Sequence, residues 1–456
     1  MVEELAIKNL TRNDTIKKVY KNFFVLIGMG VIASTVGVVF DSVLAGNVIK
    51  GVAIASISMA NPVYLLSTML FMVFSLGGAT VCSQFIGAGE REKTNIIFSL
   101  SVKVGCLIAI ICGVVIMVLR VPIVRVLGAT DPHLIEMTSS YIIGLCISMP
   151  FVLLYNVFMS FVGLDGSPQI GFVSSIVAAL SKIGLDLLLI VVFKMGIMGV
   201  SLTTGLSMIL GLLVLRKHFK KDYCSLKFVP WRQELGLLKN IILTGFPNAS
   251  SFLWAAIRAI TLNKVLLGVG GIAAMSGAGM SDSIGGLLTF VLMTFGYTMT
   301  SMLGLFYGEK DKRSMHDVLA LGLKWGLLVS MICAVLIFVL APSVPGVFGL
   351  KDPAAISAGV AAIRALAGYF ISMELHYIFL YVYQSTKHTK MANYIVISRQ
   401  ILFFVPLLYL LSGQMGLNGV WVAQVLGDWL AILSVPLIVF VQSHTNPFVI
   451  NNIFMF

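Results

Sequence analysis

Several ionisable residues stand inside long apolar segments, where a charge is costly unless it has a partner or a use. Asp186 follows Lys182 by four residues in one apolar segment, and Asp41 stands near the end of an earlier one. Residues four apart share a helix face, so the ammonium of Lys182 is expected to reach the carboxylate of Asp186. These groups can bind a proton or a cation, or they can form a structural ion pair between helices. Asp41 can also be an exposed aspartate at a helix end.

A second set of ionisable residues lies later in the chain. Glu374 and His376 stand in the apolar segment 371–377, where Glu374 can bind a cation or carry a proton and His376 can titrate near neutral pH. Asp282 is a similar single charge in another apolar segment. The alternative is that Glu374 pairs with a basic residue to hold helices together, and the candidates are Arg258, Arg364 and Arg399.

The segments that carry these residues indicate an all-α polytopic membrane protein. Of 456 residues, 58% are hydrophobic and 11% are charged, whereas a soluble domain has about 25% charged residues. The apolar blocks meet or exceed the roughly 20 residues that a helix needs to cross a bilayer. No segment alternates as barrel strands do. We predict twelve spans at roughly 20–45, 53–83, 95–119, 134–162, 169–193, 197–216, 236–268, 271–307, 314–341, 355–384, 390–412 and 417–442.

The net charge of +12 is distributed by side of the membrane. Basic residues crowd the N-terminus, the central segment 216–232 and alternate loops, whereas the opposite loops hold few: Lys50, Arg120, Arg125, Lys194 and Lys351. This positive-inside pattern predicts a multi-pass protein of the inner (plasma) membrane with both termini in the cytoplasm. The partner of the basic residues is then the lipid bilayer, and no nucleic acid is expected.

Motifs for other function classes are missing from the sequence. The six cysteines form no CxxC pair, so neither a disulfide framework nor a metal site is expected. The sequence contains no HExxH motif, no nucleophile–base pair at helical spacing and no motif typical of a channel filter. We therefore expect a transporter rather than an enzyme or a channel.

The chain contains an internal repeat. Gly87 matches Gly308, Asp131-Pro132 matches Asp352-Pro353, and 195–200 matches 415–420, each at an offset of about 220 residues. Each copy has six spans, so the copies enter the membrane from the same side and form a parallel repeat, as in some secondary transporters. The predicted domains are a cytoplasmic N-terminus 1–19, a six-helix bundle 20–216, a linker 217–234, a second six-helix bundle 235–442 and a cytoplasmic tail 443–456.

Several of these stretches, in their order and spacing, resemble the multidrug and toxic compound extrusion (MATE) transporters. They are Asp41–Asn47, Gly163–Pro168, Leu185-Asp186, Met195–Val200 and Leu417–Trp421. The resemblance covers nearly the whole chain and is closest to the DinF-like bacterial branch. It implies an antiporter with two bundles in a V that exports cationic or amphipathic organic compounds in exchange for protons or sodium ions. No organic cofactor is implied, and a monomer is expected.

The resemblance also implies roles for individual residues. Asp41 and Asp186 match the aspartates of spans one and five that couple transport to a cation, but Lys182 stands where the family usually has asparagine. Asn156 and Thr204 match positions that face the N-terminal cavity. Because the usual sodium cage is altered, we expect proton coupling through Asp41. The predicted substrate cavity comprises Asn156, Thr204, Arg258, Asp282, Glu374 and His376.

The two copies differ in their buried charges. A shift of about 220 residues places Thr261 opposite Asp41, Leu402 opposite Lys182 and Pro406 opposite Asp186. Ion coupling is therefore expected in the N-terminal copy. A lipid or polysaccharide-precursor flippase of the same superfamily remains the alternative, because such proteins have basic central cavities and this chain has buried basic residues: Lys182, Arg258, Arg364 and Arg399.

Overall fold

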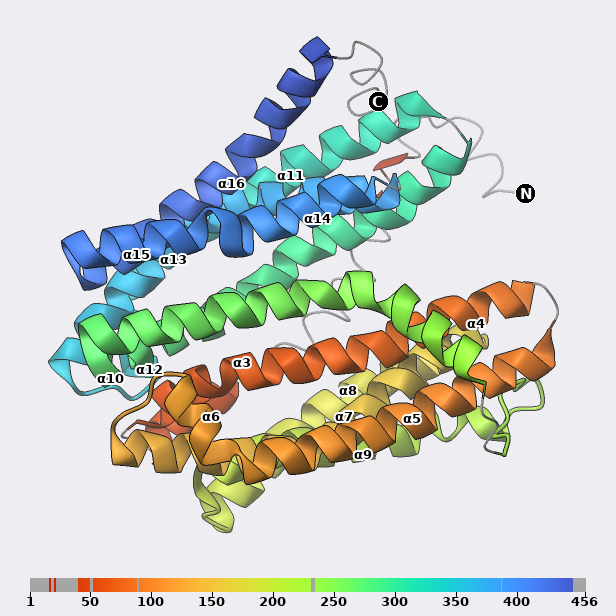
Figure 1. Ribbon diagram of the computed structural model, residues 1–456, viewed down its shortest axis with the longest axis horizontal. Coiled ribbons are helices and arrows are strands. Elements are labelled where there is room, and N and C mark those ends of the chain that lie inside the picture. Colours follow the sequence, from red (N-terminus) through yellow and green to blue (C-terminus); the bar gives the residue numbers. More distant parts are fainter. Residues whose placement is uncertain are drawn as a thin grey trace, which may run out of the picture. The chain divides into compact units, whose positions relative to one another are not determined.

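The computed structural model describes residues 16–17, 20–21, 40–49, 52–87, 90–230, 234–309, 311–386 and 388–445. Within these ranges the regular structure is helical throughout (Figure 1). This confirms the predicted all-α class. Most of the first predicted span, 20–45, and both chain termini lie outside the described residues.

The first predicted copy contains helices close to the expected spans. A short apolar helix, Phe40–Ile49, ends the first span. Its last five residues form a π-helical segment, η1 (Ala45–Ile49). The elements that follow are α3 (Ala53–Met72), η2 (Val73–Gly77), α4 (Gly78–Gly87), α5 (Arg91–Val118), α6 (Arg120–Val126), α7 (Pro132–Leu164), α8 (Pro168–Asp186), η3 (Leu187–Val192), α9 (Gly196–Leu215) and η4 (His218–Lys220).

The second predicted copy begins with α10 (Leu235–Glu309), a run of 75 helical residues. At 1.5 Å per residue this run is far longer than a bilayer core of about 30 Å. It is broken at Gly271, whose φ of 59° suits glycine, so it contains the two predicted spans 236–268 and 271–307. The remaining elements are α11 (Lys312–Leu340), η5 (Ala341–Ser343), α12 (Val344–Val347), α13 (Pro353–Ser385), α14 (Thr389–Ile397), η6 (Ser398–Leu402), α15 (Phe404–Met415) and α16 (Leu417–Thr445).

Contacts divide the chain into two compact units. One contains 36–280 and 346–355, and the other contains 1–35, 281–345 and 356–456. The first unit joins the N-terminal spans to the first half of α10, whereas the repeat predicts a boundary in the linker 217–234. The compact units reflect packing contacts, whereas the predicted domains reflect the sequence repeat. The two need not coincide, and the predicted domain limits stay a prediction.

In the first unit, α7 is the central helix and packs against α3, α5 and α9. Small residues bring α7 and α9 close: a Cβ on Gly144 would lie 2.1 Å from the Ser201 hydroxyl, and one on Gly205 would lie 2.6 Å from the Ser148 hydroxyl. Ser148 donates a hydrogen bond of 2.9 Å to the Ser201 carbonyl across the same interface. Such small-residue contacts are typical of helix packing in membranes, and they fix the face that α9 turns toward its neighbours.

Candidate functional site

The three residues predicted for ion coupling meet in one buried cluster. The Lys182 ammonium lies 2.5 Å from Oδ1 of Asp41 and 3.3 Å from Oδ2 of Asp186. The Asp186 side chain is fully buried, and the side chains of Lys182 and Asp41 are only 10% and 13% exposed. One cation thus bridges two carboxylates away from bulk water.

Thr203 on α9 completes the cluster. Its hydroxyl donates a short hydrogen bond to Oδ1 of Asp186 and lies 3.3 Å from the Lys182 ammonium, which donates to it. The sequence analysis did not name Thr203; it placed the neighbouring Thr204, which is half-buried, in the predicted substrate cavity. The sequence gives no signal for Thr203, because the face that α9 turns toward α8 depends on its packing against α7.

Local structure explains how α8 presents its two charges. Lys182 and Asp186 stand one turn apart, so they occupy the same helix face. Asp186 is the last residue of α8, and the π-helical segment η3 begins at Leu187. Such π-helical turns are frequent at functional sites.

The segment that carries Asp41 is held by its own contacts. The side chain of Asn47 donates hydrogen bonds of 2.9 Å to the Val43 carbonyl and 2.8 Å to the Val347 carbonyl. A Cβ on Gly46 would lie 2.1 Å from the Phe348 carbonyl oxygen, so only glycine fits there. These contacts tie the end of the first span to α12 and the residue that follows it.

The surroundings of the cluster are apolar and aromatic. A small core of Ala45, Ala53, Ile190, Ile197 and Val200 packs beside it, with Tyr141 partly buried against this core. Tyr141 and Tyr64 both interact electrostatically with Asp41. With both carboxylates ionised the cluster carries one negative charge, and a single proton makes it neutral. Since an uncompensated charge is expensive in such an environment, the arrangement suits the uptake and release of one proton.

Glu374 on α13 is also fully buried, but it is placed differently. Neither of its carboxyl oxygens has a hydrogen-bond partner among the described residues. Its Oε1 packs on Gly326 of α11, where a Cβ would come within 2.1 Å. Tyr20 interacts electrostatically with Glu374, and the buried Tyr20 hydroxyl also has no hydrogen-bond partner in the described part of the chain.

The pairing considered for Glu374 is not formed in the described structure. Nε of Arg399 lies 2.9 Å from Oδ2 of Asp428, and both side chains are buried. Arg364 lies over the ring of Phe338, 5.2 Å from its centroid. The basic residues that were candidates for Glu374 thus have other neighbours, because α14–η6 packs on α16 and directs Arg399 to that helix.

The other predicted cavity residues each have surroundings of their own. Asn156 is half-buried and donates 2.8 Å to the Val152 carbonyl of its own helix. Arg258 is half-buried, Asp282 is exposed, and both interact with neighbours. His376 is 5% exposed and packs edge-on against Tyr377. Their assignment to a substrate cavity stays a prediction.

A further polar cluster, which the sequence analysis did not identify, ties the linker to the turn between α7 and α8. His218 is fully buried; its Nε2 lies 2.8 Å from Oδ2 of Asp165 and its Nδ1 lies 2.8 Å from the Ser167 hydroxyl. Asp165 also accepts hydrogen bonds from the backbone N–H and the hydroxyl of Ser225. Cys224 stands beside them, and Asp165, His218 and Cys224 are residue types that can bind a metal ion. Because these hydrogen bonds join the linker to the turn between α7 and α8, we call Asp165, Ser167, His218 and Ser225 the linker clamp.

Comparison with known proteins decides the family. The MatE family profile matches residues 18–188 and 247–410, one segment in each predicted copy. The chain belongs to the MatE family. It is therefore a MATE transporter and a multi-pass membrane protein, not an enzyme.

Curated and solved relatives agree with this membership. The multidrug export protein MepA of Staphylococcus saprophyticus is 23% identical over 389 residues, which are 85% of this MATE chain and 85% of MepA. An inward-facing multidrug resistance MATE family transporter of the MOP superfamily superposes with a TM-score of 0.78 at 20% identity, covering 90% of this chain and 96% of that one. A MOP superfamily transporter of Pyrococcus furiosus gives a TM-score of 0.72 at 20% identity over 92% and 94% of the two chains. These likenesses confirm the twelve-helix fold class.

Proposed function

We propose that this MATE transporter is a secondary-active multidrug efflux antiporter coupled to protons. The observation that carries the proposal is the position of Lys182, whose ammonium stands between Asp41 and Asp186. A sodium ion bound by these two carboxylates would need the place that the ammonium takes. The site therefore keeps two carboxylates that can be protonated while its cation is covalently fixed.

The exchange follows from the change of charge in the cluster. When Asp41 takes a proton, its attraction to Lys182 falls and the ammonium is left with Asp186 and Thr203. The contact between the end of the first span and α8 is then weakened, which alters the relative free energies of two conformations. A proton that binds one conformation better than the other shifts their populations, as alternating access requires.

The proposed substrates are small cationic or amphipathic organic compounds. The printed name of the MepA relatives, multidrug export protein, supports this class. Glu374 supplies a buried carboxyl group with no hydrogen-bond partner among the described residues, which suits a role with a proton or a cation. Of the four basic residues that favour the flippase alternative, Lys182 and Arg399 are held by carboxylates, which weakens that alternative.

The proposed location is the inner membrane, and the proposed assembly state is a monomer. The positive-inside pattern supports an inner-membrane location with both termini in the cytoplasm. Transport of this kind uses proton-motive force and requires no organic cofactor.

The test is transport in proteoliposomes that contain the purified full chain and ethidium as the probe. A pH gradient in sodium-free choline buffer is expected to drive ethidium movement, and a sodium gradient at constant pH is expected to drive none. Asp41→Asn should abolish the pH-driven movement, whereas Asp317→Asn, at a position outside the cluster, should leave it unchanged. A strict requirement for sodium would overturn the proposal.

A further inference from the structure

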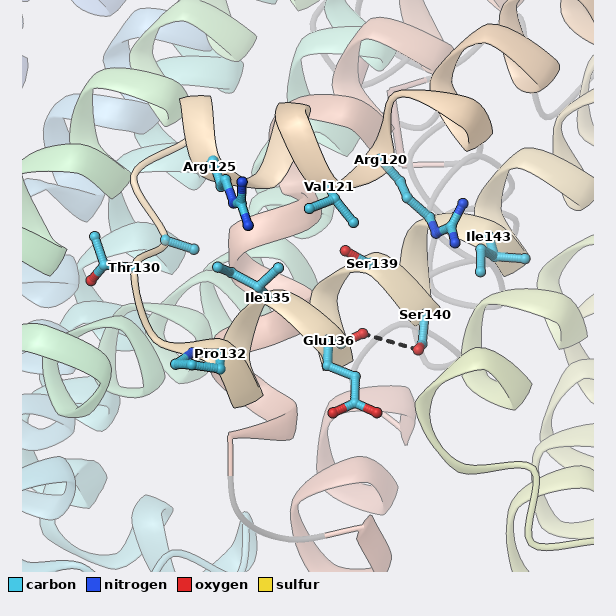
Figure 2. A pocket seen from close by; sticks show the side chains of 11 residues that line it. Arg120, Val121, Arg125, Thr130, Pro132, Ile135, Glu136, Ser139, Ser140 and Ile143 are labelled. Atoms are coloured by element: carbon cyan, nitrogen blue, oxygen red, sulfur yellow. Dashed lines mark hydrogen bonds between the residues drawn. The ribbon is translucent and has the colours of Figure 1, made fainter.

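A cavity of about 740 Å³ lies between α6 and the first turns of α7, well apart in sequence from the charged cluster (Figure 2). Arg120 and Arg125 line it from α6, and Ser139 and Ser140 line it from α7. The remaining lining is largely apolar. Helix α6 follows directly on α5, so the cavity lies at the end of a predicted membrane span.

The two arginines of this cavity have no ion-pair partner among the described residues. Arg120 donates one hydrogen bond of 2.9 Å from Nη1 to the Met117 carbonyl of the preceding turn, which leaves its other N–H groups available. Glu136 also borders the cavity, but its carboxylate points away from both guanidinium groups (Figure 2). The buried hydroxyl of Ser139, another lining residue, has no hydrogen-bond partner in the described part of the chain.

The loop that holds these arginines is one in which the positive-inside pattern predicts few basic residues. Two guanidinium groups on one short helix, facing one cavity, therefore need a purpose other than topology. Guanidinium groups bind phosphate oxygens in a planar, bidentate manner. A phosphate group in the cavity would give a lining arginine the partner that the described protein residues do not supply.

Residues close in sequence to the two arginines are apolar and exposed. Val118, Leu119 and Val126 are 69%, 46% and 65% exposed. They continue the apolar surface of α5, which faces lipid in the predicted topology. A ligand with a phosphate and acyl chains can thus contact the arginines and this surface together, whereas free phosphate would use only the arginines.

We propose that this cavity binds the phosphate headgroup of an anionic phospholipid, with Arg120 and Arg125 as the phosphate-binding residues. Lipid bound here contacts α6 and α7 of the unit that contains Asp41, Lys182 and Asp186. The lipid site shares no residue with the proposed coupling cluster. The proposal of lipid binding is therefore independent of the coupling ion and of the substrate.

Binding of short-chain lipids to the purified full chain in detergent, measured by native mass spectrometry, tests the proposal. Dihexanoyl phosphatidylglycerol is expected to bind more tightly than dihexanoyl phosphatidylcholine, and inorganic phosphate is expected to compete only weakly. Each basic residue near an anionic lipid surface contributes about a factor of five in affinity. Arg120→Gln with Arg125→Gln should therefore weaken phosphatidylglycerol binding about 25-fold.

The matched control removes two exposed charges elsewhere. Lys220→Gln with Lys221→Gln in the linker should leave the affinity for phosphatidylglycerol within about a factor of two. If the arginine variant does not fold, Thr130→Glu places a negative charge at the exposed edge of the same cavity, and it should also weaken binding. Unchanged phosphatidylglycerol binding in the arginine variant or in Thr130→Glu would overturn the proposal, as would inorganic phosphate binding as tightly as the lipid.

Discussion

The ammonium of Lys182 lies 2.5 Å from Oδ1 of Asp41, although the two residues are 141 positions apart in the sequence. The pair joins the end of the first span to the fifth span, and both side chains are largely buried. Removal of one member of a buried ion pair costs about 3–5 kcal/mol because the other charge is left uncompensated. Here Asp186 remains beside Lys182 when Asp41 is neutral, so the cluster can change its charge without losing its cation.

Lys182→Asn is expected to make ethidium transport respond to sodium. The variant removes the tethered ammonium and leaves Asp41, Asp186 and an amide oxygen that can bind a hard cation through oxygen. In proteoliposomes at constant pH, a sodium gradient should then drive ethidium movement that is absent in the parent protein. Lys239→Asn, at an exposed position on α10, is the control and should show no response. A variant that is stable and still indifferent to sodium would contradict the role given to Lys182.

Thr203→Val tests the hydroxyl that the sequence analysis did not identify. Valine keeps the shape and removes the hydrogen bond to Asp186, and a hydrogen bond to a charged group contributes about 2 kcal/mol. Thermal unfolding in detergent should show a loss of this size, together with a shifted pH dependence of transport. The matched variant Thr204→Val should be close to the parent protein in both measurements. Equal effects of the two variants would argue against Thr203 as a member of the cluster.

Glu374→Gln and Asp428→Asn should differ in their effects on the free energy of unfolding. Glutamine keeps the size of Glu374 and replaces a carboxyl group that has no hydrogen-bond partner in the described structure, so stability should be unchanged or higher. Asparagine at 428 removes the carboxylate that the buried Arg399 contacts, and a loss of about 3 kcal/mol is expected. Thermal unfolding of the two variants beside the parent protein measures both. A large destabilisation by Glu374→Gln would show that this carboxyl has an essential structural partner.

The linker clamp predicts a particular dependence of stability on pH. Burial opposes ionisation of Asp165, but hydrogen bonds from Ser225 and His218 outweigh it and hold the pKa of Asp165 below its usual value. A group with a lowered folded pKa stabilises the protein above its unfolded pKa of about 3.9, and this stabilisation is lost as the pH falls through the folded value. Asp165→Asn should therefore reduce the melting temperature at neutral pH and flatten its decrease on acidification.

The control for this prediction is Asp222→Asn in the same linker, where the side chain is exposed. It should retain the melting temperature and the acid profile of the parent protein. If Asp165→Asn and Asp222→Asn behave alike across the pH range, the clamp does not contribute to stability.

Much of the helical fold could be predicted from the sequence, because apolar length alone determines a span. The predicted spans 53–83 and 169–193 agree with the apolar helices Ala53–Ser83 and Pro168–Val192 within a residue or two. The contact of Lys182 with Asp186 could also be predicted from the sequence, since it follows from helical periodicity.

Other features depend on tertiary packing and could not be predicted. The hydrogen bond from Thr203 to Asp186 depends on the face that α9 presents, which is set by the Gly144 and Gly205 contacts between α7 and α9. The partner of Arg399 is Asp428 on the next span rather than Glu374, which no spacing rule reveals. The linker clamp joins Asp165 and His218, which are 53 positions apart. No local sequence pattern predicts this contact.

The central claim is that the ammonium of Lys182 takes the place of a bound metal cation. Isothermal titration calorimetry with sodium chloride at constant ionic strength, on the parent protein and on Lys182→Asn, tests it most directly. The claim predicts no saturable sodium binding by the parent protein and saturable binding by Lys182→Asn that disappears when Asp41→Asn is added. Saturable sodium binding by the parent protein that Asp41→Asn abolishes would contradict it.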